Sequence, residues 1–579
     1  MRQSQAALFR ATCKQSLATR LIGALAAGTL AAGLVAGCSG QNQVPSIGYA
    51  VDSVIASYNG GSTLGASSGS AAVFGRVLTG FFYTGPDGQQ VADTDAGTAK
   101  EVPGEAQTIQ YRLNPDGVYS DGVPTSCDDL VLAWAARSGR FTKPGAPMFD
   151  AASSAGYADI ERVDCQPGSK DATVVFRPDR HFLPWRTLFA AGELMPAHVA
   201  ARVANVPNVV SALQTGDPSG IQRLADFWNS GWTMGSGGLD LSRFPSSGPY
   251  RIESYSAKDG LVLVSNERWW GNKAETGRIV VWPKTVDLKA KVSDNAVGVV
   301  DVGAGSVKDL NLDGFSVHNV PGRGAEQLVL ATGGVFGSVD ARRAFALCVP
   351  RQALFDKLGK AKDAPKTGLG TGPLNSRIVQ QDSLYYPAAT GAADRYRGAD
   401  VPAATAALAA ARTVNPTIRI GYLQPDERRT QTVAMIAEAC KTAGITVVDA
   451  GSADFTPSQL TEGKVDAVLA STASTPGPAG SLAAIAATSA LRTGSGLNFG
   501  RFGNGRYDAI TDQLAADDNS TTTLNLLTEA ENLLWSEMPS VPLFANPRTI
   551  AFGNGLRNGI AGPTQGGTGW NMDRWVLKR

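Results

Sequence analysis

Hydrophobic and polar residues alternate over several short stretches of the chain, which is the pattern of β-strands that bury one face. We expect strands at residues 49–57, 108–113, 160–164 and 261–266. The first strand ends at a run of Asn and Gly residues, 59–61, which forms turns readily. The last strand follows another that is launched by the turn at 246–250, and we expect the two to form a hairpin.

Helices are expected at residues 127–137, 339–358, 426–442 and 523–538. Ser126 is a good N-cap for the first helix, and Asp128 and Asp129 lie in its first turn, where the helix dipole favours acidic groups. We therefore interpret these two aspartates as structural rather than catalytic. In the second helix the apolar residues share one face, but Pro350 must kink or divide it.

The third helix lies between two predicted strands, at 417–422 and 445–448, and Gly444 is its stop signal. A strand–helix–strand unit of this kind implies a right-handed crossover and parallel pairing. After the last helix, residues 541–544 are predicted to form a short extended segment that leaves the helix, an exit segment. The pattern predicts an α/β architecture.

The N-terminal stretch is typical of a bacterial lipoprotein signal. Basic residues at positions 2, 10, 14 and 20 precede an uncharged Ala/Leu/Gly-rich run that closes on Val35-Ala36-Gly37-Cys38. We expect cleavage before Cys38, whose thiol would carry the lipid. The run is about 17 residues, too short for a comfortable span. The mature protein is therefore expected on the extracytoplasmic face of the cell membrane, held by its lipid anchor.

Composition narrows the class of protein. Lys and Arg number 52 and Asp and Glu 51, and no dense basic run occurs, so nucleic-acid binding is not expected. About 540 residues would remain after processing, more than one hydrophobic core normally serves, so at least two lobes are expected.

Apart from Cys38, which would carry the lipid, four cysteines would remain in the mature chain, an even number that suits an exported protein: Cys127, Cys165, Cys348 and Cys440. We pair Cys127, which opens a helix, with Cys165, which ends a strand. For Cys348 and Cys440, which lie in Ala-rich helical stretches, a bond and two buried thiols both remain open.

The sequence predicts neither a metal site nor a cofactor. It contains no CxxC or HExxH motif, and His181, His198 and His318 are widely spaced. An enzyme is not expected either, because the Gly-rich run at 368–373 lacks the lysine of a phosphate-binding loop and three histidines leave little room for general acid–base catalysis.

Five segments resemble, in order and spacing, the solute-binding proteins of the oligopeptide/dipeptide class, family 5, which serve ABC importers. They are YSDGVP at 119–124, SGPY at 247–250, NERWWG at 266–271, VDARRAFAL at 339–347 and WSEMPSVPL at 535–543. The signal and the stretches at 184–186 and 497–500 look most like actinobacterial, especially mycobacterial, oligopeptide-binding lipoproteins.

The resemblance implies a two-lobed α/β clamp of the type II periplasmic-binding-protein kind with an extra inserted N-terminal domain. It divides the chain into a signal (1–37), first-lobe segments (38–78, 191–328 and 545–579), an inserted domain (79–190) and a second lobe (329–544). Ligand would bind between the lobes, and closure around it would be sensed by the permease subunits of the importer. A monomer is expected.

One departure from the family concerns the ligand. Peptide-binding members carry a Trp and, three residues later, an Asp that pairs with the peptide's ammonium group, but this chain has Thr472 and Thr475 at those positions. A buried ammonium without its carboxylate would cost several kcal/mol. Asp454 or Glu462 could supply another acid. The hydroxyls of Ser471, Thr472, Ser474 and Thr475 would instead suit sugars, blocked or modified peptides, or uncharged polar solutes.

Seven residues are candidate ligand contacts, although each also has an interpretation as a turn or packing residue: Tyr58, Asn59, Thr472, Ser474, Thr475, Asn498 and Phe499. The leading hypothesis is a solute-binding lipoprotein that captures oligopeptides, peptide-like molecules or other small polar solutes for an ABC importer. The alternative is an accessory lipoprotein of cell-envelope assembly that uses the same fold to bind a glycolipid or a protein partner and transports nothing.

Overall fold

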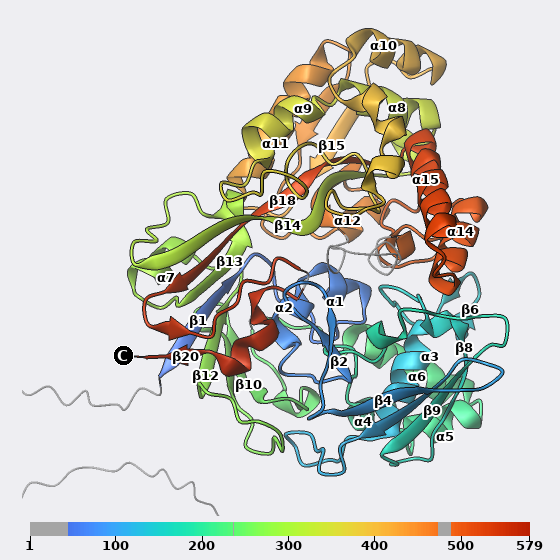
Figure 1. Cartoon of the computed structure of the whole chain (residues 1–579), viewed down its shortest axis with the longest axis vertical. Coiled ribbons are helices and arrows are strands. Elements are labelled where there is room, and N and C mark those ends of the chain that lie inside the picture. Colours follow the sequence, from blue (N-terminus) through green and yellow to red (C-terminus); the bar gives the residue numbers. More distant parts are fainter. Residues whose placement is uncertain (1–44, 236, 473–487, 565, 579) are drawn as a thin grey trace, which may run out of the picture. The chain divides into compact units, whose positions relative to one another are not determined.

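A sheet of ten strands runs through the described part of the chain, which comprises residues 45–235, 237–472, 488–564 and 566–578 of the computed structural model (Figure 1). From one edge to the other its strands are β10 (Tyr250–Ser256), β11 (Gly260–Ser265), β12 (Arg278–Trp282), β1 (Ser46–Val51), β13 (Val299–Gly303), β18 (Ser540–Gly553), β14 (Phe315–Leu330), β17 (Ala467–Thr472), β15 (Thr417–Gly421) and β16 (Thr446–Asp449).

The two long central strands, β14 and β18, are antiparallel and connect the two halves of this sheet. One end of β18 pairs with β13, from Val299 opposite Phe552 to Gly303 opposite Arg548. The far end of β14 pairs instead with β17. Between these ends the register shifts after Pro321, which faces Pro547. Neither proline has an N–H to donate, which explains why the ladder is interrupted at this point.

The first half of the chain adds a second sheet of four strands, in the order β4 (Gly97–Val102), β5 (Thr108–Leu113), β9 (Asp171–Phe176) and β8 (Ile160–Asp164). Its helices are α1 (Thr63–Ser67), α2 (Ser70–Phe74), α3 (Cys127–Arg137), α4 (Ala197–Ala204), α5 (Val209–Gln214), α6 (Pro218–Ser230) and α7 (Leu288–Ser293). Three two-stranded sheets complete the strands: β2 (Phe82–Thr84) with β3 (Gln90–Ala92), β6 (Thr142–Lys143) with β7 (Ala146–Pro147), and β19 (Leu556–Arg557) with β20 (Val576–Leu577).

The later part of the chain has a core of its own, which includes Leu328, Phe345, Ile420 and Leu543. The helices of this part are α8 (Val339–Cys348), α9 (Arg351–Leu354), α10 (Val401–Ala410), α11 (Glu427–Lys441), α12 (Ser458–Thr461), α14 (Gly505–Ala516) and α15 (Ser520–Glu537), of which α14 packs instead against the core of the earlier part. No helix among the described residues is long and apolar enough to cross a membrane.

Several predicted elements have the expected bounds. β5, β8 and α3 begin and end where the sequence pattern places them. Ser126 caps α3 in a capping box with Asp129. The helix predicted at 339–358 is divided at Pro350, with a short π-helical turn at Phe355–Gly359. β15 and β16 are parallel, as a strand–helix–strand unit requires.

Two expectations about strands were wrong. The strand predicted at 49–57 is β1, which ends at Val51, because the next residue, Asp52, turns to accept hydrogen bonds from the backbone N–H of Gly303 and the side chain of Lys284. The exit predicted at 541–544 is part of a 14-residue strand, β18. This strand is buried over most of its length between β13 and β14. It therefore extends as far as its backbone hydrogen bonds to these two strands do.

Candidate functional site

Two adjoining cavities are each lined by residues from both the earlier and the later part of the chain. The first, here called the central cavity, has a volume of about 350 Å³ and is lined by residues of β1, β13, β17 and β18, among them Tyr49, Asp301, Ser471 and Arg548. The second, the side cavity, has a volume of about 320 Å³. Ala66, Leu497 and Thr564 line both cavities, which therefore adjoin. Volumes of this size suit small-molecule ligands.

Asp52 lines the central cavity directly after β1. Its Oδ1 accepts hydrogen bonds from the Lys284 ammonium at 2.7 Å and from the Ser306 hydroxyl at 2.8 Å, and its Oδ2 accepts one from the Gly303 N–H at 2.9 Å. Burial would by itself raise the pKa of Asp52, but the charge on Lys284 outweighs burial and holds the pKa well below its usual range. Asp52 is therefore ionised, and Lys284 compensates its negative charge.

Asp301 and Arg548 form the second charge pair of the central cavity, and they lie on neighbouring strands of the sheet. Arg548 donates to Asp301 Oδ1, while Asp301 Oδ2 accepts from the Thr568 N–H at 2.7 Å. Although burial disfavours the charged guanidinium, Asp301 outweighs it and raises the pKa of Arg548. Both oxygens of this carboxylate are occupied by protein groups.

The side cavity contains a third pair, Arg137 of α3 with Glu193. The guanidinium lies 2.6 Å from Glu193 Oε1, and the Tyr157 hydroxyl donates to Oε2 at 3.0 Å. Arg137 also stacks over the Tyr157 ring, 4.2 Å from its centroid. Both oxygens of the Glu193 carboxylate are therefore paired with protein groups.

Some neutral polar groups of the walls have no partner in the described part of the chain. They are the hydroxyl of Ser53 in the central cavity, the hydroxyl of Thr564 in the wall shared by both cavities, and the indole N–H of Trp570 in the side cavity. Thr564 is only 7% exposed. The Trp570 ring stacks on Tyr83, which also lines the side cavity, with centroids 6.2 Å apart and planes 20° apart. Arg137 Nη1 also lacks a hydrogen bond, but it is ion-paired with Glu193 at 2.6 Å, so the wall groups without any partner among the described residues are uncharged.

Residues 95–490 match the model of the bacterial extracellular solute-binding proteins, family 5, middle region. The chain belongs to this family. It is 42% identical over 568 residues to the uncharacterized lipoprotein Rv2585c of Mycobacterium tuberculosis, covering 97% of this chain and 99% of that protein. It is 25% identical over 508 residues to the oligopeptide-binding protein OppA of the same species, covering 84% of this chain and 78% of OppA.

Among solved structures, the periplasmic EDTA-binding protein EppA is similar, with a TM-score of 0.72 and 20% identity over 93% of this chain and 97% of that one. The fold is accordingly that of family 5: a two-lobed α/β clamp of the type II periplasmic-binding-protein kind with an inserted N-terminal domain.

The structure places the predicted ligand contacts of this family 5 protein in different surroundings. Phe499 lines the central cavity. Ser471, one of the hydroxyl residues expected to suit a neutral solute, also lines it. Thr472 ends β17, opposite Ala325 of β14. Ser474 and Thr475 lie outside the described residues. The acids considered as replacements for the missing aspartate, Asp454 and Glu462, line neither cavity.

The other three candidates have the surroundings of structural residues. Tyr58 is fully buried and its hydroxyl donates to the carbonyl of Pro245. Asn59 bridges the Trp228 carbonyl and the Gly61 N–H within a turn. Asn498 likewise both donates to and accepts from the backbone of Phe502. The side chains of all three form hydrogen bonds within the protein, and none of the three lines either cavity.

The charged residues of the cavity walls were missed by the sequence interpretation. One signal was available: Asp301 is a single acidic residue inside the apolar run Val299–Gly303. A charge in a buried strand needs a partner or a function. Its partner, Arg548, is 247 positions away, and no local pattern connects the two.

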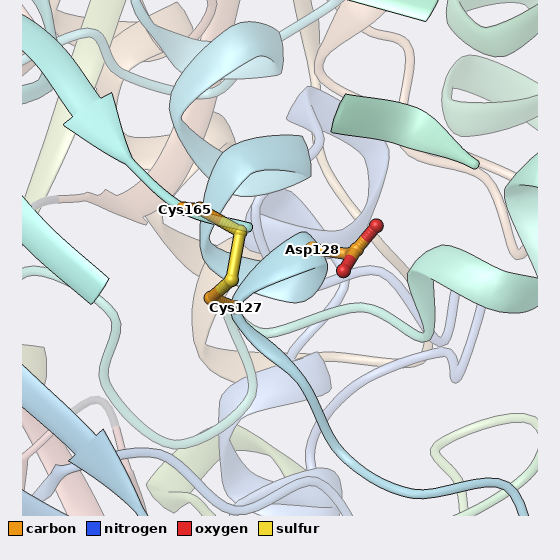
Figure 2. A group of neighbouring side chains, drawn as sticks. All are labelled: Cys127, Asp128 and Cys165. Atoms are coloured by element: carbon orange, nitrogen blue, oxygen red, sulfur yellow. A yellow bond between two sulfur atoms is a disulfide. The ribbon is translucent and has the colours of Figure 1, made fainter. Parts of the chain in front are cut away.

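One group among the described residues has the composition of a metal site, Cys127, Asp128 and Cys165, whose ligand atoms lie within 4.8 Å of one another (Figure 2). The two sulfur atoms are bonded to each other, so no thiolate is available to a metal. Asp128 accepts from the Gly168 N–H at 2.7 Å and from the Ser126 hydroxyl at 3.0 Å. The group is a disulfide beside a helix cap. Cys348 and Cys440 are joined by a second disulfide, which links α8 to α11.

Proposed function

We propose that this protein is an extracytoplasmic receptor that captures a small solute in the central and side cavities and delivers it to the permease subunits of an ABC importer. One observation carries the proposal: the central cavity is lined from both halves of the sheet, by Asp52 and Arg548 on one side and Ser471 and Phe499 on the other. A solute bound there contacts both halves, so its binding energy can favour a closed arrangement.

The proposal includes the location of the protein. Cleavage before Cys38 and lipidation of its thiol would attach the protein to the outer face of the cell membrane. The naming of the relative Rv2585c as a lipoprotein supports this part of the proposal. Cys38 itself lies outside the described residues.

We also propose how the chain is divided between the lobes. The first lobe takes residues 38–78, 191–328 and 545–579, the inserted domain 79–190, and the second lobe 329–544. The pairing of β14 and β18 supports this division, because each strand has one end in either half of the sheet.

Peptides or peptide-like molecules are the first solute class to test, because OppA, a relative over most of the chain, is named an oligopeptide-binding protein. We would express residues 39–579 without the lipid, purify the protein from its own host, and identify by native mass spectrometry the molecules released on denaturation. A set of solute masses, together with loss of uptake of the same solutes in a deletion strain, is the expected result. An empty protein whose deletion changes envelope composition but no uptake would favour the accessory role.

A matched pair of variants connects binding to the cavity. Ser471→Trp fills the central cavity from β17, whereas Ser316→Trp places the same side chain on an exposed position of β14 outside it. We expect the first variant to lose the co-purified solute and the second to retain it, with similar melting temperatures.

A further inference from the structure

We infer that the ligand of these cavities is an uncharged, hydroxyl-rich molecule of the carbohydrate class, whose ring stacks on Trp570 and whose hydroxyls bond to Thr564 and Ser53. The inference rests on the proposed function, since it takes the central and side cavities as the solute site.

Five charged side chains among the described residues line the two cavities: Asp52, Asp301, Arg548, Arg137 and Glu193. Each of the three carboxylates has a protein cation within 3.0 Å, and both of its oxygens accept hydrogen bonds or ion-pair contacts. No unpaired charge is left among these lining residues to attract a charged ligand.

A peptide with free termini would therefore bind poorly. Its ammonium group would have to displace Lys284, Arg548 or Arg137 from a carboxylate, or enter the cavities unpaired. Breaking a buried pair leaves an uncompensated charge, which is strongly unfavourable. A ligand without charge avoids this cost.

Three neutral polar groups of the cavity walls lack partners among the described residues. Thr564 and Ser53 each offer a hydroxyl, which can both donate and accept, and Trp570 offers an indole N–H, which only donates. A buried polar group without a partner is costly, and a ligand that supplies the partner recovers that cost. Sugar hydroxyls donate and accept as well, so they complement all three groups.

A pair of aromatic side chains forms part of the wall of the side cavity. Trp570 and Tyr83 stack nearly parallel in the side cavity, and Arg76 lies 5.1 Å from the Tyr83 centroid. A sugar ring has one face of C–H groups and a rim of hydroxyls. An indole offers a matching combination, an apolar face with a polar N–H at its edge.

The test is binding by the purified chain of residues 39–579, freed of co-purified solute by unfolding and refolding. Isothermal titration would use neutral gluco- and manno-oligosaccharides, tri- to pentapeptides with free termini, and the same peptides acetylated and amidated. We expect binding to an oligosaccharide and none to the free peptides.

Two variants assign that binding to the named groups. Trp570→Ala should weaken it about tenfold or more, as truncation of a buried aromatic contact does, and Thr564→Val should weaken it several-fold by removing one hydrogen bond. The controls are Trp134→Ala and Thr523→Val, because their indole N–H and hydroxyl also lack a partner in the described part of the chain but these residues line neither cavity. Both controls should bind as the unmodified protein does.

The possible outcomes separate the two proposals. Binding of free peptides, or of capped peptides alone, would overturn the carbohydrate inference and leave the receptor proposal standing. Oligosaccharide binding that Trp570→Ala and Thr564→Val do not weaken would overturn the assigned site. If no solute of any class binds and the protein purified from its host is also empty, both the inference and the proposed function fail.

Discussion

Lys284 and Asp426 form a buried ion pair, 3.6 Å apart, between the two halves of the ten-stranded sheet. Lys284 follows β12 in the first half, and Asp426 is the N-cap of α11 in the second. The same ammonium donates to Asp52 at 2.7 Å. The Lys284 side chain is 3% exposed and the Asp426 side chain 1%. A single buried cation therefore compensates carboxylates from both halves, next to the central cavity that Asp52 lines.

Replacement of Lys284 should destabilise the protein strongly. In Lys284→Gln the Asp52 carboxylate loses the lysine that pairs with it, and the ion pair left to Asp426 among the described residues is that with Arg429, at 3.7 Å. Leaving a charge buried without its partner costs about 3–5 kcal/mol. We expect the free energy of unfolding at pH 7, measured by urea denaturation, to fall by about that amount.

The control for this prediction is Lys308→Gln, which breaks an ion pair between the same two halves of the chain, with Glu427 of α11 at 3.4 Å. Both of these side chains are well exposed, at 60% and 43%. An exposed pair contributes at most about 1 kcal/mol. Equal losses in the two variants would contradict the special role of Lys284.

Glu326 should make the protein sensitive to acid. It is buried on β14 and paired with Arg428 and Arg429 of α11. Burial alone would raise the pKa of Glu326, but the two guanidinium groups outweigh burial and lower it to about 2. The group therefore contributes stability above its unfolded pKa of 4.5, and that stability is lost as the pH falls towards 2.

The variant Glu326→Gln tests this prediction. It should lose about 3–5 kcal/mol at pH 7, because two guanidinium groups remain buried, and the loss should shrink as the pH is lowered from 4.5 to 2. Glu253→Gln, in a more exposed pair with Arg278, is the control and should change little. A loss at Glu326 that does not vary with pH would show that the carboxylate is not ionised in the folded state.

Asp129 should have the opposite pH dependence. Burial raises its pKa to about 6, although it accepts hydrogen bonds from the N–H groups of Ala197 and Ser126. Its contribution to stability is therefore complete below the unfolded pKa of 3.8 and is lost as the pH rises through 6. The shift corresponds to about 3 kcal/mol.

We would measure the free energy of unfolding between pH 4 and pH 7 for the protein and for Asp129→Asn. The unmodified protein should lose stability relative to the variant as the pH rises through this interval. Parallel curves for the two proteins would contradict a raised pKa at Asp129.

The two disulfides should stabilise the protein unequally. Cys127–Cys165 closes a loop with a sequence separation of 38, and Cys348–Cys440 one with a separation of 92. The loop-entropy relation assigns about 4 kcal/mol to the shorter loop and somewhat more, about 4.6 kcal/mol, to the longer. Denaturation of the two double Cys→Ser variants should show the larger loss for Cys348/Cys440. The reverse order would indicate that local packing around α3 outweighs loop length.

Individual helices and strands could be predicted from the amino-acid sequence alone. α3 has the predicted bounds because its cap, its first-turn acids and its apolar positions lie within a dozen residues of one another. β5 and β8 follow from alternation over five or six residues. The family, too, followed from five short segments spread along the chain.

The end of β1 and the roles of Tyr58 and Asn59 could not be predicted from the local sequence. β1 stops where Asp52 meets Lys284, which is 232 positions away. The side chains of Tyr58 and Asn59 donate hydrogen bonds to the backbone carbonyls of Pro245 and Trp228, which are more than 160 positions away. The same holds for the chemistry of the cavities, where Asp301 pairs with Arg548 across neighbouring strands and Arg137 pairs with Glu193. Hydrogen bonds and side-chain periodicity within a helix or strand depend on close neighbours in the chain, whereas burial and charge compensation depend on groups that only the folded chain brings together.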